Sequence, residues 1–569
     1  MTVRVLVVAR GYPSFDAPGR GSFVADHVTA LRDAGAEVVV TSFETVQARG
    51  PQAERQAAAD AAEKLWRVTL ADPAVLSLGG GFGAEGVPVA RLPVVRSWGA
   101  MDGSEVPVMV ARHRAPLVAF GEAMAAAGRR FDVVHAHNGL PDGAAAVALA
   151  SALGVPLVVT EHDSTLPERL RDPAAAAVYR ELLASATVVT VSEAIAARIT
   201  DALDASGAPA ARLHGVLPNV VPLSRFPPPS ATAERDLDQL LWVGARAPHK
   251  GFETLLRAFA IARARRPALH LRAIGSSTPD DETRWRALID DLGIGNAVVL
   301  EPAAARDDVG VVMRRAGLFV HPSPFETFGM VAAEALASGL PVAATPSGGV
   351  EGILDGDPAR GEVALAPSPE ALADAIERLR DRADTVDRPA LRATVEARYA
   401  PHVIAARTLA LYAEAGARAV EDEQTTEPVA RSSRPIVGAV VVGRHPSAAA
   451  RVGALPAGAL PVRLVQPRVA TAKAAVIGEA RLLTHIARLR AGAAAGSSQG
   501  PAIADPMEAA WRELGGDADP GRVVLVPADI EDVSAIATAF DGEGARHLAP
   551  GSLRWLGDVR DASAARVGR

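Results

Sequence analysis

Two glutamates, Glu326 and Glu334, carry the clearest chemical meaning in this sequence. Glu326 lies in a short polar turn, and Glu334 lies eight positions later in an alanine-rich run with the composition of a helix. Eight helical residues rise about 12 Å, so the two carboxylates stand too far apart to flank one glycosidic bond, as a retaining glycosidase requires. At that spacing they can hold the two ends of a long ligand.

The backbone between the two glutamates predicts a binding site for an anion. Phe328, Gly329 and Met330 stand where the turn passes into the helix, so their N–H groups have no acceptor within it and can bind phosphate. A carboxylate, a phosphate site and a second carboxylate in a row suit a nucleotide-diphosphate sugar. The plainer alternative is that the two glutamates only cap the helix and stabilise its dipole.

The flanking elements place this segment at a ligand-binding edge. An apolar run at 317–320 precedes the turn, and a second run at 340–344 follows the helix and ends in Ser-Gly-Gly at 347–349. Strand, loop, helix and strand form a βαβ unit, whose polar loop lies at the carboxyl edge of a parallel sheet. That edge is where α/β proteins bind their ligands.

The rest of the chain repeats the alternation of strands and helices. Residues 1–215 predict one doubly wound α/β domain, and residues 216–394 predict a second, with a proline-rich crossing at 218–230. Helices are expected at 21–35 and 143–153. Strands are expected at 4–9, 37–41, 133–135, 157–160, 188–191 and 240–243.

The last quarter of the chain differs in composition. Residues 421–434 are rich in Ser, Thr and Glu and predict a linker. Residues 435–569 predict an additional folded α/β domain of unknown role. In this domain strands are expected at 436–442 and 523–526, and helices at 471–490 and 505–514.

Composition sets the broad class of the protein. The 569 residues are 49% hydrophobic with a mean hydropathy of +0.15, and they contain no cysteine, which excludes disulfides and thiolate metal sites. A net charge of -7 gives no support for nucleic-acid binding. The apolar start is too short for a signal peptide, and Gly154 and Pro156 interrupt the longest apolar stretch. We expect a cytoplasmic protein without a transmembrane segment; contact with the inner face of the membrane stays open.

The segment PSPFETFGMVAAEALASGLPV, with Glu326 and Glu334 in the spacing E-x7-E, resembles the signature of the family 4 retaining glycosyltransferases of group 1. The resemblance covers roughly residues 1–418. It implies the GT-B fold, in which two doubly wound Rossmann-like domains face a cleft, and a helix at 395–418 that returns to the first domain. It also implies that Glu326 contacts the donor sugar, that Glu334 contacts the ribose hydroxyls, and that the loop amides hold sugar and diphosphate.

The same resemblance assigns further donor-binding residues. Lys250, in the segment VGARAPHKG, would neutralise the departing diphosphate. Arg246 is its expected partner, although the family's arginine stands one position earlier, where this chain has Ala245. Gly275 is expected near the nucleotide base, and Gly21 near the donor phosphates. The alternatives are a basic surface turn for the first pair and ordinary turn chemistry for the loop around Gly21.

Three histidines follow predicted strands of the first domain. A lone histidine there is usually structural, but His162 matches the family's T-x-H pattern, which implies that it approaches the donor sugar. His135 and His137 are expected to shape the acceptor side. A His-x-His pair could bind a metal, yet the sequence shows no carboxylate or third ligand at matching spacing, so no metal is expected.

Together these features predict a retaining glycosyltransferase. A sugar would move from a nucleotide-diphosphate sugar to a hydroxyl of a glycan, a lipid or a small molecule, with no cofactor and with His162, Glu326 and Lys250 as the catalytic set. Two alternatives stay open: a nucleotide-sugar epimerase or phosphorylase on the same fold, and a non-catalytic scaffold that binds sugars or partner proteins. The donor base and sugar, the acceptor and the oligomeric state cannot be read from the sequence.

Overall fold

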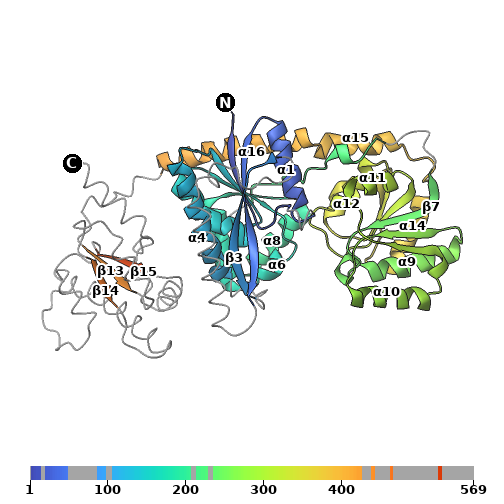
Figure 1. Ribbon diagram of the computed structural model, residues 1–569. Helices are drawn as coiled ribbons and strands as arrows, with labels where there is room; N and C mark the ends of the chain where they lie inside the picture. Colours follow the sequence, from blue (N-terminus) through green and yellow to red (C-terminus); the bar gives the residue numbers. More distant parts are fainter. Residues whose placement is uncertain are drawn as a thin grey trace. The chain divides into compact units, whose positions relative to one another are not determined.

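The computed structural model describes residues 2–13, 19–48, 86–97, 106–206, 213–228, 235–425, 438–442, 462–465 and 523–527 (Figure 1). The chain divides into two compact units, Met1–Asp422 and Glu423–Arg569. The first unit contains two six-stranded parallel sheets, each covered by helices. This is the GT-B architecture that the sequence predicts.

The first sheet has the strand order β3-β2-β1-β4-β5-β6. Alternate residues of β1 face two different cores, because successive side chains of a strand point to opposite faces. Val5 and Val7 pack with the helices α1 and α16, whereas Leu6 and Val8 pack with α4 and α5. The strands are β1 (Arg4–Ala9), β2 (Glu37–Ala48), β3 (Val89–Ser97), β4 (Val133–His137), β5 (Leu157–Glu161) and β6 (Thr187–Thr190).

Sequence reasoning missed the outer strand of this sheet. The strand β2 runs to Ala48, beyond the predicted end at residue 41, and β3 pairs with it in parallel. Pro93 lies within β3, which is an edge strand, where proline is tolerated. The helices of this half are α1 (Ser22–Asp33), α4 (Val106–Ala126), η3 (Gly139–Gly143), α5 (Ala144–Leu153), α6 (Leu166–Arg169), α7 (Pro173–Ser185) and α8 (Glu193–Ala205).

The second sheet has the strand order β12-β11-β10-β7-β8-β9. One face packs through Leu240 and Trp242 against α9, α10 and α14, and the other packs through Leu241 and Phe319 against α12 and α15. The strands are β7 (Asp236–Val243), β8 (His270–Ile274), β9 (Val298–Glu301), β10 (Ala316–His321), β11 (Val342–Ala344) and β12 (Gly361–Val363). The helices are η4 (Leu223–Arg225), η5 (Pro248–Lys250), α9 (Phe252–Arg265), α10 (Pro279–Asp291), η6 (Gly295–Ala297), α11 (Arg306–Met313), α12 (Met330–Ala337), α13 (Gly349–Leu354), α14 (Pro369–Arg380), α15 (Arg388–Tyr399) and α16 (Pro401–Thr425).

The chain returns to the first half through two helices, not through the single helix expected at 395–418. The helix α15 ends at Tyr399, and α16 begins at Pro401. Ala400 between them is extended, as a residue before proline prefers to be. The helix α15 packs on the second half, whereas α16 packs on the first through Ile404 and Tyr412.

The second unit is described only at three strands. They are β13 (Gly438–Val442), β14 (Val462–Val465) and β15 (Val523–Pro527), which pair in parallel in the order β14-β13-β15. The strands expected at 436–442 and 523–526 correspond to β13 and β15. The helix α16 continues to Thr425, so the first residues of the predicted linker are helical. The helices expected at 471–490 and 505–514 lie outside the described residues.

None of the helices in the described part of the chain has the length and apolar content needed to cross a membrane.

A chain shortened to end at Asp422 should fold and bind nucleotide, because the division between the two units falls there and all predicted site residues precede it. Calorimetry and nucleotide titration of the shortened protein, beside the full chain, measure this. An insoluble product, or one that melts far below the full chain and binds no nucleotide, would show that residues 423–569 belong to the core.

Candidate active site

A cavity of about 510 Å³ lies between the two halves of the first unit. The carboxyl ends of parallel strands from both sheets supply its walls, as expected for an α/β fold. The first half contributes Arg10, Phe23, Asn138, His162, Asp163, Ser164 and Asn219. The second half contributes residues 242–244 and 326–331 together with Lys250, His321 and Ser323.

An ion pair between Lys250 and Glu326 lies in the wall formed by the second half. The two side chains come from different loops, one after β7 and one after β10, and their Nζ and Oε1 atoms are 2.8 Å apart. Ser323 Oγ donates a second hydrogen bond to Glu326, at 2.9 Å. Burial alone would raise the pKa of Glu326, but His321, Lys250 and Ser323 outweigh burial and hold that pKa below its usual value. Glu326 is therefore ionised at neutral pH.

The first turn of α12 opens onto the same cavity. Phe328, Gly329, Met330 and Val331 all line it. The helix begins at Met330, and its first turn contains no acidic side chain. The N–H groups of this turn, which have no acceptor within the helix, therefore complement Lys250 as binding groups for an anion.

Glu334 does not line this cavity. It is buried, and its carboxylate forms an ion pair with Arg306, at the start of α11. Arg306 also binds Asp26 of α1 at 2.6 Å, so it joins the two halves. Burial raises the pKa of Glu334, and Arg306 opposes this shift. Sequence reasoning missed Arg306 because nothing in the local pattern near residue 306 points to a ligand.

Arg246 and Gly275 also lie away from the cavity wall. Arg246 donates to the Glu301 carbonyl at 2.6 Å and to Glu282 Oε2 at 3.0 Å, so its guanidinium is committed to structural partners. Packing alone explains why position 275 is glycine, because a Cβ there would lie 1.6 Å from the Gly244 carbonyl oxygen. The structure does not bring either residue to the Lys250–Glu326 pair, and their donor-binding roles stay predictions.

Gly21 closes the loop before α1. Its φ of 66° is left-handed, and a Cβ would lie 2.1 Å from the Gly11 carbonyl oxygen. Both facts require glycine at this position. Residues 14–18 of the loop lie outside the described residues, so the predicted contact of this loop with phosphate stays a prediction.

His162 reaches the large cavity from the end of β5. Its ring lies between Phe23, at a centroid distance of 4.6 Å, and His137, at 5.2 Å. His162 Nε2 and His137 Nδ1 share a hydrogen bond of 2.9 Å, and the His162 backbone N–H donates to Asn138 Oδ1 at 3.3 Å. These contacts fix the ring at the cavity wall.

His135 and His137 are buried behind His162 and do not line the large cavity. His135 forms hydrogen bonds with the Tyr412 hydroxyl at 2.7 Å and with Thr160 Oγ1 at 2.8 Å. Neither histidine contacts the large cavity directly, so their role on the acceptor side stays a prediction. His137 is linked to the cavity by its hydrogen bond to His162.

The sequence shows no third ligand at matching spacing near the His-x-His pair, but the fold brings one from a distant segment. The helix α1 places His27 beside His135 and His137, and one ring nitrogen of each lies within 4.8 Å of the others. Burial lowers the pKa of His27 to about 4 and that of His162 to about 3, and the pKa values of the other two histidines also lie well below the usual value. All four rings are therefore neutral at pH 7.

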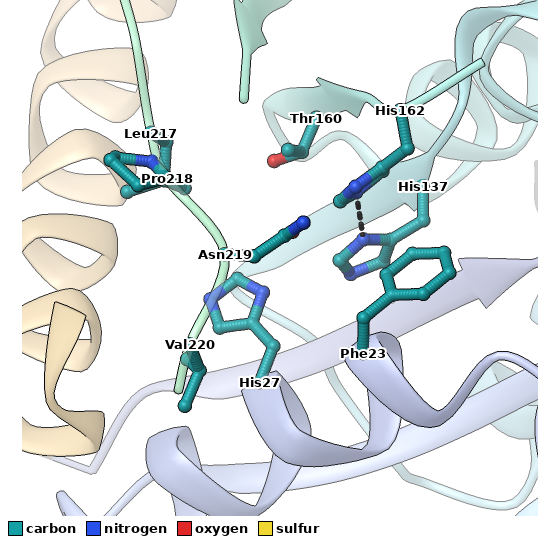
Figure 2. Close-up of a pocket in the computed structure, with 9 residues that line it drawn as sticks. All are labelled: Phe23, His27, His137, Thr160, His162, Leu217, Pro218, Asn219 and Val220. Atoms are coloured by element: carbon teal, nitrogen blue, oxygen red, sulfur yellow. Dashed lines mark hydrogen bonds between the residues drawn. The ribbon is translucent and has the colours of Figure 1, made fainter. Parts of the chain in front are cut away.

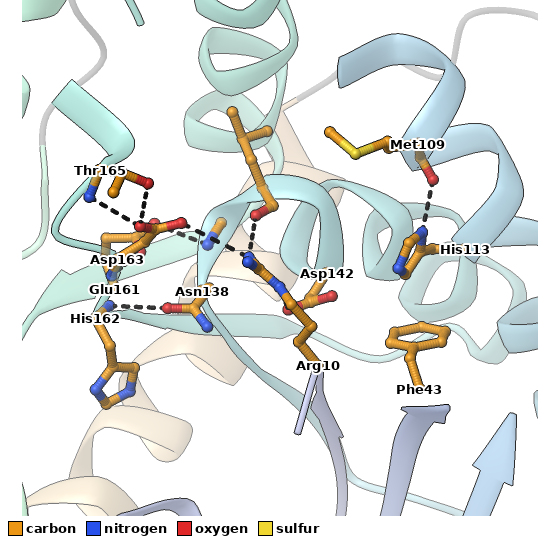
Figure 3. A network of polar contacts seen from close by, with 12 residues as sticks. Arg10, Phe43, Met109, His113, Asn138, Asp142, Glu161, His162, Asp163 and Thr165 are labelled. Atoms are coloured by element: carbon orange, nitrogen blue, oxygen red, sulfur yellow. Dashed lines mark hydrogen bonds and ion pairs between the residues drawn. The ribbon is translucent and has the colours of Figure 1, made fainter. Parts of the chain in front are cut away.

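A second polar network, which the sequence did not reveal, surrounds Arg10 at the end of β1 (Figure 3). Arg10 donates to the Leu140 carbonyl at 2.6 Å and lies 3.5 Å from Asp142 and 3.7 Å from Asp163. Asp142 is fully buried, and burial raises its pKa to about 6. Arg10 and Asp163 line the large cavity, so this network forms the polar wall of the first half.

Glu161 anchors the loop that carries His162 and Asp163. Its carboxylate is buried and accepts hydrogen bonds from the N–H groups of Gly139, at 2.7 Å, and Asp163, at 2.8 Å. Burial raises its pKa to about 7, and Asp163 adds to this shift. The position of Glu161 between a strand and His162 was a signal that sequence reasoning passed over.

Comparisons with known proteins cover most of the first unit. Residues 19–219 match the family described as "Glycosyl transferase 4-like domain", and residues 229–393 match "Glycosyl transferases group 1". A D-inositol 3-phosphate glycosyltransferase of Thermobispora bispora is 35% identical over 343 residues, which are 55% of this chain and 76% of the relative. An MMP alpha-(1->4)-mannosyltransferase of Mycolicibacterium hassiacum is 29% identical over 313 residues, which are 51% of this chain and 73% of the relative.

The fold is also found among solved structures. A sucrose-phosphate synthase from Thermosynechococcus elongatus aligns with a TM-score of 0.54 and 20% identity, over 73% of this chain and all of that one. The predicted fold class is thus confirmed by the sheet topology and by this likeness. Since both family matches and the T. bispora relative agree with the geometry, the chain belongs to the group 1, family 4 glycosyltransferases.

Proposed function

We propose that this glycosyltransferase moves a sugar from a nucleotide-diphosphate sugar to an acceptor hydroxyl, with retention of configuration and without a metal ion. The observation that carries the proposal is the Lys250–Glu326 pair beside the first turn of α12, inside a cavity bounded by both halves. A cation, a carboxylate and free amides at one wall supply the groups that a charged sugar donor needs.

The diphosphate would lie against Lys250 and the first turn of α12. As the bond to the sugar breaks, negative charge grows on the leaving oxygen, and a fixed ammonium and backbone N–H groups stabilise it. Glu326 holds Lys250 in place, and in the complex its carboxylate would accept hydrogen bonds from the sugar hydroxyls. Both side chains are at least partly exposed to the cavity, at 36% for Lys250 and 18% for Glu326.

Retention would follow from attack on the face that the diphosphate leaves. The carboxylates that line the cavity in the described part of the chain, Asp163 and Glu326, are each held by a cation, which makes a covalent sugar intermediate on either of them unfavourable. His162 is neutral and lines the cavity, where its ring would contact the sugar. The acceptor would enter along the wall of the first half, beside Arg10 and Asp163.

The relatives differ in what their names say they act on. One is named for D-inositol 3-phosphate, and another is named a mannosyltransferase. We therefore leave the acceptor as a glycan, a lipid or a small molecule. A thermal-shift screen with UDP-, GDP- and ADP-sugars identifies the donor, because a ligand that binds only the folded state raises the melting temperature.

The same screen separates the proposal from its alternatives. A donor that raises the melting temperature and is slowly hydrolysed supports a transferase. Conversion of the donor to its epimer, or a requirement for free phosphate, would identify an epimerase or a phosphorylase. Binding without any turnover would identify a scaffold.

Lys250→Ala should lower kcat about 100-fold, because the leaving diphosphate loses a strong electrostatic partner. Steady-state kinetics with the identified donor measure this. His249→Ala is the matched control, since His249 is the exposed residue next to Lys250 in the same turn and does not line the cavity. Equal kcat for Lys250→Ala and the control would remove Lys250 from the site.

Glu334→Gln should weaken nucleotide binding more than it lowers kcat, because ribose contacts differ little between the ground and transition states. Asp26→Asn is the comparison variant, since it removes the other carboxylate that binds Arg306. Calorimetric titration with the nucleotide should show a loss of affinity for Glu334→Gln alone. If both variants change affinity alike, Glu334 acts by holding Arg306 and does not bind the ribose.

Activity should survive EDTA, because Lys250 and the amides of α12 already balance the diphosphate charge. The assay compares chelated and untreated enzyme at the same donor concentration. Loss of activity on chelation, with recovery on addition of Mn²⁺ or Mg²⁺, would contradict metal independence.

A further inference from the structure

Four buried or partly buried histidines, His27, His135, His137 and His162, form one group between α1 and the ends of β4 and β5, here called the histidine cluster. Figure 2 shows three of them, His27, His137 and His162. The rings of His135 and His137 stack at 4.6 Å, and those of His137 and His162 stack at 5.2 Å. Of the four, His162 alone lines the large cavity. The cluster therefore extends from the protein interior to the wall of the large cavity.

The hydrogen bonds of the cluster leave two buried ring nitrogens without a partner among the described residues, one on His137 and one on His162. Both nitrogens of His135 are bonded to hydroxyl groups, and His27 Nε2 is bonded to Thr408 Oγ1 at 2.9 Å. His137 Nδ1 is bonded to His162 Nε2, but His137 Nε2 and His162 Nδ1 are both buried and have no partner among the described protein atoms. An unpaired buried polar nitrogen is costly, which calls for a partner outside the protein.

A small second cavity provides the space for that partner. It measures about 10 Å³ and is lined by His27, His137, His162 and Asn219, with Phe23 and residues 217–218 among its apolar walls (Figure 2). About 10–15 Å³ is enough for one water molecule, provided that two or more polar groups bind it. The histidine rings and the Asn219 amide supply such groups.

A water molecule fits this cavity better than a metal ion. A zinc site here would use the ring nitrogens of the triad His27, His135 and His137, which lie within 4.8 Å of one another. His135 has no free ring nitrogen, and the triad contains no carboxylate to balance a buried dication. A water molecule needs neither a free nitrogen on His135 nor a carboxylate.

We propose that one ordered water occupies the small cavity and donates a hydrogen bond to His137 Nε2, so that His137 is held in the Nδ1-protonated tautomer and acts as a positioning residue for His162. The inference rests on the proposed function, in which His162 faces the donor sugar.

The physical reason lies in the shared hydrogen bond. Two neutral imidazoles joined by one bond must divide the roles, since one nitrogen donates and the other accepts. A water that donates to His137 Nε2 leaves the proton on His137 Nδ1, which donates to His162 Nε2. His162 then carries its own proton on Nδ1. The tautomer of a site histidine is commonly set by such a partner on its other nitrogen.

The test uses the full-length protein with ¹⁵N-labelled histidine, in which long-range NMR spectra report the tautomer of each ring. In the wild type His162 should be a single Nδ1-protonated tautomer. His137→Leu should leave a mixture of tautomers at His162 and lower kcat about 10- to 100-fold, by analogy with the loss of partners that orient metal-bound histidines, with the donor KM little changed. His137→Gln, which keeps a hydrogen-bonding amide, should recover part of the loss.

Tyr412→Phe is the matched control, because it deletes a buried hydrogen bond of the same cluster without touching His137 or His162. It should lower the melting temperature as His137→Leu does, yet keep kcat and the His162 tautomer. An unchanged His162 tautomer in His137→Leu would overturn the proposal. So would stoichiometric zinc in the purified wild type that is lost in His137→Leu. The NMR result stands even if no sugar transfer is found, so it is separate from failure of the proposed function.

Discussion

The ion pair between Lys250 and Glu326 is the interaction around which the candidate site is arranged. It joins the loop after β7 to the loop after β10, which belong to adjacent parallel strands and so end at the same edge of the sheet. The pair holds the Lys250 ammonium near the N-terminus of α12, where free N–H groups already favour an anion. Without a ligand, the Glu326 carboxylate balances the charge of Lys250, so the proposed diphosphate site does not carry an unpaired charge.

The wall formed by the first half works differently. Its histidines are neutral because burial opposes their protonation, and its carboxylates are bound by Arg10, Arg169 or backbone N–H groups. The donor side thus offers fixed charge, and the opposite side offers oriented hydrogen-bonding groups with little net charge. That division suits a reaction in which charge leaves with the diphosphate while a hydroxyl approaches from the other half.

The parts of the site that could be predicted from the sequence are local. Glu326, Lys250 and the first turn of α12 each follow a strand within a few residues, so the pattern of strand and loop was enough to bring them to one edge. Arg246 shows the limit of this reasoning, because a neighbouring position along the chain did not place its side chain beside Lys250. The carboxylate of Glu282 and the carbonyl of Glu301 bind it instead.

The parts that could not be predicted depend on contacts between distant segments. Asp26 and Arg306 are 280 positions apart, and His27 meets Thr408 across 381 positions. No local periodicity or spacing in the sequence predicts these contacts, because they depend on how α1, α11 and α16 pack. The same holds for β3, where Pro93 is compatible with a strand because β3 lies at the sheet edge.

The stereochemistry of transfer tests the central claim most directly. Time-resolved proton NMR of the anomeric signal, recorded during turnover of the donor identified by thermal shift, gives the configuration of the sugar when it first appears in product. The account predicts the same anomeric configuration as in the donor. First appearance of the opposite anomer would contradict it, because attack would then come from the face opposite the Lys250-bound diphosphate.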